Sequence, residues 1–168
     1  VIRTTVHRFL QPNDYRLNDK VAAFELDRPL FSNTGWEDKI LVHLPDANQQ
    51  FDDETINNIN KHFNEAADIC QQKGILLVFM AAANKSDVYY PYIKNAPADW
   101  QETTTMQKLD ALPKKYVFVN TEKIFRQVLK NGFGEEVKDI YWLDDLHFSW
   151  KGQQIIGEYL HNQLKGKI

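Results

Sequence analysis

The chain has 168 residues, of which 43% are hydrophobic and 26% charged, a balance that predicts one folded domain over residues 1–168. The formal net charge is −3, and no basic stripe is interleaved with aromatic residues, which argues against a nucleic-acid partner. The single cysteine, Cys70, excludes an internal disulfide framework and a cysteine-rich zinc site. No apolar run is long enough to cross a bilayer, so membrane attachment would need a segment outside this chain.

The first part of the chain predicts an irregular opening followed by two strands. Residues 1–20 are polar, with a turn indicated at 11–14 by Pro and Asn. Two strand-like stretches follow at 21–26 and 39–44. Between them, Asn-Thr-Gly at 33–35 predicts a chain reversal.

The clearest helix is predicted over residues 53–73. Apolar side chains recur there at helical spacing, and the two aspartates that open it suit a first turn, where the helix dipole favours negative charge. Gly74 can end the helix in the left-handed conformation. The run 75–80 is apolar at every position, which predicts a central parallel strand covered by helices on both faces.

The second half of the chain repeats this alternation. A weak helix at 103–112 precedes a buried strand at 116–119, and Thr121 can cap a helix that runs through residue 130. A short strand is predicted at 137–142. Ser149 can then cap a last helix, whose expected buried residues are Ile155, Ile156, Tyr159, Leu160 and Leu164. This order predicts an α/β protein of three layers, with a mainly parallel, flavodoxin-like sheet that is incomplete at the amino terminus.

An acid–histidine group lies between the last predicted strand and the last helix. It consists of Asp144, Asp145 and His147. In an open α/β sheet, ligands bind at the carboxyl ends of strands. A carboxylate there can orient an imidazole, whose other nitrogen then takes a proton from a serine hydroxyl. The competing interpretation is a helix cap beside a solvated charge.

The surrounding residues carry a resemblance to a known family. Tyr141-Trp142, Asp145, His147 and Gly152 resemble the last conserved block of the SGNH/GDSL hydrolase superfamily, in its branch of alginate O-acetyltransferase-like and "DHHW" proteins. Leu146 and Phe148 stand where that branch usually has Thr and Trp. Residues 84–92 resemble a second block of the branch, and the likeness covers residues 30–165.

The resemblance implies a function and its site. It implies an acyl-ester hydrolase or O-acetyltransferase that acts on carbohydrate or a small acyl ester, in the cell envelope and without a metal or cofactor. His147 would be the catalytic base. Its acid would be Asp144 by the spacing of the superfamily or Asp145 by that of the branch. Asn84 and Lys85 would contact substrate.

The nucleophile of that family is missing from the sequence. No Gly-Asp-Ser block is present, so the serine would be supplied outside this chain. Ser32, Ser86 and Ser149 are weaker alternatives, the last being better explained as a helix cap. Trp36, Trp100 and Trp150 could stack on sugar rings or belong to the core. A non-catalytic module that binds glycan or a protein partner is the alternative function.

Overall fold

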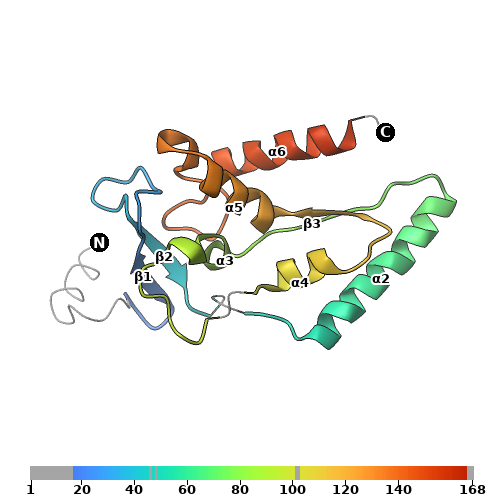
Figure 1. The fold of residues 1–168 in the computed structure, drawn as a ribbon, viewed down its shortest axis with the longest axis horizontal. Helices are drawn as coiled ribbons and strands as arrows, with labels where there is room; N and C mark the ends of the chain where they lie inside the picture. The colour runs from blue at the N-terminus through green and yellow to red at the C-terminus, as the bar shows by residue number, and fades with distance from the viewer. Residues whose placement is uncertain (1–16, 46, 48, 101–102, 166–168) are drawn as a thin grey trace.

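The chain combines strands and helices, as expected for an α/β protein (Figure 1). The computed structural model describes residues 17–45, 47, 49–100 and 103–165. The predicted turn at 11–14 lies outside the described residues. Two two-stranded sheets and five α-helices make up the regular structure of the described part.

The first two strands form a hairpin on the amino-terminal side of the molecule. β1 (Val21–Glu25) pairs antiparallel with β2 (Lys39–His43). The predicted reversal at 33–35 is confirmed, because Trp36 N donates to Asn33 O at 2.8 Å and Gly35 adopts φ 77°. A positive φ of this kind favours glycine.

The second sheet is parallel and lies between helices. β3 (Val78–Ala81) pairs with β4 (Val117–Asn120). In Figure 1, α2 and α4 lie on one side of β3, and α5 and α6 lie on the other. The bounds of these helices are α2 Asp53–Gln72, α4 Thr105–Ala111, α5 Thr121–Asn131 and α6 Trp150–Leu164. The helices predicted at these places are therefore confirmed.

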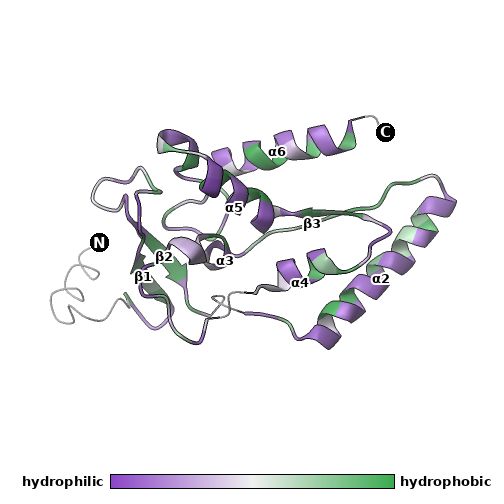
Figure 2. Cartoon of the chain, in the orientation of Figure 1, coloured by the Kyte–Doolittle hydropathy of each residue, from purple (hydrophilic) through white to green (hydrophobic). Residues whose placement is uncertain are grey.

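The expected large central sheet is not formed by the described residues. β3 starts at Val78 rather than at residue 75, because Ile75 N still donates to Cys70 O at the end of α2. In the described part β3 pairs only with β4, so its other edge is open. The strand and the residues before it are hydrophobic (Figure 2), yet Ile75 and Met80 are 56% and 46% exposed. A middle layer of two strands is too small for a full three-layer fold.

The strand predicted at 137–142 is wrong. Gly134–Val137 is a short 3-10 helix (η2), and Asp139 adopts φ 56°, which interrupts an extended run. Further along, Tyr141 forms one isolated bridge with Phe148. Residues 85–92 are helical, with α3 at Lys85–Tyr89 and the 3-10 helix η1 at Tyr90–Tyr92.

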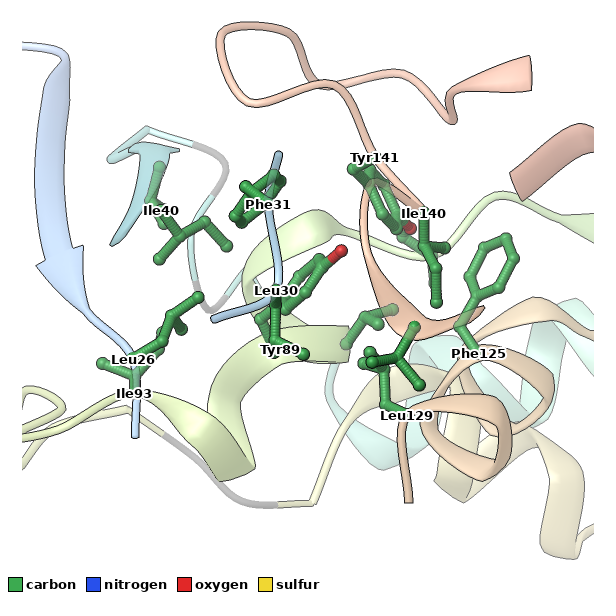
Figure 3. Packing of buried hydrophobic residues seen from close by; sticks show 14 of the residues in the cluster. Leu26, Leu30, Phe31, Ile40, Tyr89, Ile93, Phe125, Leu129, Ile140 and Tyr141 are labelled. Atoms are coloured by element: carbon green, nitrogen blue, oxygen red, sulfur yellow. The ribbon is translucent and has the colours of Figure 1, made fainter. Parts of the chain in front are cut away.

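A core of aromatic and aliphatic side chains joins the hairpin, α3 and α5. Figure 3 shows Tyr89 and Phe125 on either side of the segment that carries Tyr141. The ring of Tyr141 packs edge-on against Tyr89 and Phe125 at centroid distances of 5.9 and 5.6 Å. Its hydroxyl donates to Ala83 O at 2.7 Å. This packing fixes the start of the segment that holds the acid–histidine group.

A candidate acid–histidine site

The acid–histidine group lies on a turn that folds back on itself. Tyr141 and Phe148 bridge its two ends, and Ser149 N donates to Ile140 O at 3.0 Å. The ring of Phe148 packs on Phe125 at 4.9 Å. The stem of the turn is therefore held by the core, while its tip, residues 144–147, is exposed to solvent.

The start of α6 closes the turn from its other side. Ser149 is the N-cap, and its Oγ accepts from the N–H groups of Lys151 and Gly152 at 3.1 and 3.2 Å. The same hydroxyl donates to Asp139 O. The prediction that Ser149 caps the last helix is confirmed, and its hydroxyl is committed to that role.

Asp145 is the carboxylate that contacts His147. Its Oδ1 lies 2.5 Å from Nδ1 of the imidazole and accepts the main-chain N–H of His147 at 3.0 Å. The main-chain N–H, followed by the imidazole, holds the pKa of the Asp145 carboxyl below its usual range. The side chains of His147 and Asp145 are 85% and 50% exposed, so the ring faces open solvent.

This arrangement gives the imidazole one held nitrogen and one free to react. In the tautomer with its proton on Nδ1, the ring donates to Asp145 and leaves Nε2 as an acceptor. A hydroxyl brought to Nε2 could transfer its proton there, and the carboxylate would stabilise the resulting imidazolium. Geometry alone thus favours Asp145 over Asp144 as the partner of His147.

Asp144 instead lines a surface hollow of about 270 Å³ beside the turn. The hollow is lined by Ser32, Asn33, Asp139, Trp142, Leu143 and Asp144. Ser32 Oγ donates to the Asp139 carboxylate at 2.5 Å, which occupies this hydroxyl with an acid. Trp142 is 42% exposed, so it offers an aromatic face next to the acid–histidine pair. The sequence placed Trp142 next to the two aspartates, but its exposure could be known only from the structure.

Lys85 lies under the turn rather than on the surface. It is the first residue of α3 and only 3% exposed. Its Nζ donates to the main-chain oxygens of Trp142 and Leu143, both at 2.7 Å, and of Asp145 at 3.2 Å. Asn84, the N-cap of α3, lines a small cavity of about 40 Å³ together with Lys85, Ser86 and Leu146. Substrate contact by Asn84 and Lys85 stays a prediction.

The other candidates are spread over the fold. Ser86 is buried, and no serine hydroxyl of the described residues hydrogen-bonds to His147. Trp100 packs on Phe24 at 5.3 Å and belongs to the edge of the core, whereas Trp150 is 75% exposed at the start of α6. Trp36 is partly buried beside the ammonium of Lys39.

The described residues contain neither a candidate metal cluster nor a candidate membrane span. No group of three or more His, Cys, Asp or Glu side chains in the described part could hold a metal ion. None of the helices within those residues combines the length and the apolar character needed to cross a membrane.

Comparison with known proteins identifies a fold neighbour. The sequence matches no protein-family model and no curated protein. Among solved structures, the chain is similar to Bacillus cereus PatB1, with a TM-score of 0.54 at 16% sequence identity. The match covers 84% of this chain and 42% of PatB1, so the chain spans less than half the length of that protein. At this identity the likeness concerns the fold alone.

Proposed function

We propose that this chain forms the acid–histidine part of a serine-dependent acyl-transfer enzyme of the SGNH type, outside the cytoplasm. The substrate is an acyl ester on carbohydrate, and the reaction is ester hydrolysis or O-acetyl transfer. The observation that carries the proposal is the contact of 2.5 Å between Asp145 Oδ1 and Nδ1 of an exposed His147. The fold likeness to PatB1 supports the α/β architecture only.

The residues of this chain have defined parts in that reaction. Asp145 keeps the imidazole in one tautomer and orientation, so Nε2 accepts the serine proton as the hydroxyl attacks the acyl carbon. The histidine then gives this proton to the departing sugar oxygen. Water or a second sugar hydroxyl, deprotonated by the same Nε2, then attacks the acyl carbon, and the histidine returns the proton to the departing serine oxygen.

The open edge of β3 is where a serine-bearing segment fits. β3 is paired on one side in the described part, and its surroundings expose apolar side chains such as Leu76 and Met80. The carboxyl ends of parallel strands meet at the same edge of a sheet. A parallel strand added beside β3 would end near Asn84 and Lys85, and Lys85 contacts the turn that carries His147.

Aryl acetate hydrolysis by the longest polypeptide that contains these residues tests the proposal. We expect His147→Ala to lower kcat/KM by about 10²–10⁴-fold, because the proton acceptor is removed. Asp145→Asn should lower it by a similar factor, since the amide cannot hold the same tautomer. Asp144→Asn is the matched control and should stay within about threefold.

The outcomes separate this enzyme from its alternative. Unchanged turnover in His147→Ala would end the acid–histidine proposal. Absence of turnover, together with binding of a glycan by the unaltered protein, would favour a non-catalytic binding module. That second function is favoured by one observation, namely that no serine hydroxyl of the described residues reaches the imidazole.

A further inference from the structure

A buried lysine ties the acid–histidine turn to α3. The three oxygens that accept from Lys85 Nζ all belong to residues 142–145 of this one turn. They lie 57 to 60 positions along the chain from the lysine. In the described part, the hydrogen bonds of this ammonium go to main-chain carbonyls and not to a carboxylate. A protonated amine has three N–H donors, which matches the three carbonyls.

The exposed tip of the turn has few other supports. The hydrogen bond from Trp142 N to His147 O is long, at 3.4 Å, and Asp145 contacts His147 from within the same tip. The contacts of Lys85 therefore link the turn to α3, two of them at Trp142 and Leu143 before the tip and one at Asp145 within it.

We propose that Lys85 is a positioning residue for the Asp145–His147 pair. Its buried Nζ donates to the carbonyls of the turn from the interior and so fixes where the carboxylate and the imidazole point. The catalytic meaning of this role rests on the proposed function, whereas the structural link does not. This role differs from substrate contact, in which Nζ would donate to a substrate oxygen rather than to the carbonyls of the turn.

The surroundings of Lys85 make the opening of the turn depend on pH. Burial lowers the pKa of Lys85 to about 7, against the opposing charges of Asp144 and Asp145. The ring of Phe31 lies 5.6 Å from Nζ, and His43 of β2 is the other ionisable side chain at the adjoining cavity. Asp87 and Tyr89 are the other ionisable groups of α3 itself.

The sign of this dependence follows from linkage. When the turn opens to water, Lys85 regains a pKa close to its ordinary 10.5. Above pH 7 the open state thus binds a proton that the closed state lacks, so a rise in pH disfavours opening by up to about tenfold per pH unit. Below that range both states are protonated, and Lys85 makes opening independent of pH.

Amide hydrogen exchange of the intact chain tests the positioning role. In Lys85→Met, we expect the amides of residues 142–147 to exchange at least about tenfold faster, because the hydrogen-bond donor beneath the turn is lost. The ¹⁵N shifts of His147 should also report a smaller fraction of the Nδ1–H tautomer. Lys114→Met is the matched control, since Lys114 also donates to main-chain oxygens, those of Asp110 and Leu112. It should leave both readouts within about twofold.

The pH dependence of the unaltered protein is the second measurement, and it decides the matter if Lys85→Met does not fold. After correction for intrinsic exchange, opening of the turn should become rarer between about pH 7 and pH 9. His43→Gln should keep this trend and Lys85→Met should abolish it. Normal exchange and tautomer in a folded Lys85→Met, or a flat pH profile in the unaltered chain, would overturn the proposal.

Neither readout uses an ester, so the two proposals fail separately. If the longer polypeptide does not turn over an aryl acetate while Lys85→Met still loosens the turn, the proposed function fails and the link stands. If turnover depends on His147 but Lys85→Met leaves the exchange of the turn unchanged, the positioning role fails and the proposed function stands.

Discussion

At the level of single residues, Gly152 sets how closely α6 approaches the acid–histidine turn. A Cβ at this position would lie 2.3 Å from Ile140 O and 3.1 Å from Phe148 Cβ, both of which belong to the stem of the turn. A backbone oxygen cannot move aside as a flexible side chain can. The glycine in the family-like block therefore has a packing reason that the structure makes visible.

Two glycines of the same helix form a matched test of that packing. We expect Gly152→Ala to lower the free energy of unfolding by about 1–3 kcal/mol through overpacking. Gly157→Ala should raise it by about 0.5–1 kcal/mol, because nothing lies within 4 Å and alanine is the better helix former. Urea unfolding followed by circular dichroism measures both. Equal effects of the two substitutions would contradict the close approach.

At the level of elements, a buried polar cluster joins α3, α4 and α5. The carboxylate of Glu122 is 1% exposed and accepts from Thr104 Oγ1 at 2.5 Å and from Gln107 Nε2 at 3.0 Å. Arg126 pairs with Glu122 at 3.0 Å and donates to Asp87 O at 2.7 Å. The cluster holds α3 in place, and with it Lys85.

This cluster makes stability depend on pH through Asp87. Burial, followed by the charge of Glu122, raises the pKa of Asp87 to about 6 from its ordinary 3.8. The folded state therefore keeps a proton that the unfolded chain releases, and this contribution to stability declines as the pH rises from about 4 to about 6. Asp87→Asn should remove the decline and leave the protein about 2 kcal/mol more stable at pH 7.

Urea unfolding at a series of pH values measures this effect. Asp38→Asn serves as the control because Asp38 is exposed and accepts the N–H of Leu26 through its main-chain oxygen. A slope between pH 4 and 6 that persists in Asp87→Asn would assign the dependence to another group.

At the level of the whole molecule, β3 has an unpaired edge among the described residues. Exposed apolar side chains gather on and before this strand, among them Ile75, Leu76 and Met80. An unpaired hydrophobic edge is a template for pairing with another chain. The same edge that would receive a serine-bearing strand therefore gives the isolated chain a route to self-association.

Self-association through this edge should respond to a charge placed on it. We expect the sedimentation coefficient of the chain to rise with concentration, and Met80→Lys to suppress the rise because it would bury an unpaired charge. Phe133→Lys is the control, since Phe133 is 78% exposed after α5 and away from β3. Suppression by Phe133→Lys but not by Met80→Lys would place the contact elsewhere.

Local sequence signals predicted most of the regular elements of this chain. The helical spacing and the first-turn acids placed α2, and Ser149 placed the start of α6, because caps and periodicity act within a few residues. The prediction of a strand at 137–142 failed because of a contact between residues far apart in the chain. Asp139 is held at positive φ while its carboxylate binds Ser32, a residue 107 positions away.

The sequence by itself determined the α/β alternation and put Asp144, Asp145 and His147 next to one another, since neighbours in the chain are neighbours in space. It left open which aspartate meets the ring. Tertiary structure decided that, because the turn bends so that Asp145 faces His147 while Asp144 lines the hollow. It also decided the role of Lys85, since only folding brings α3 under the turn and buries an ammonium against carbonyls that no local pattern could reveal.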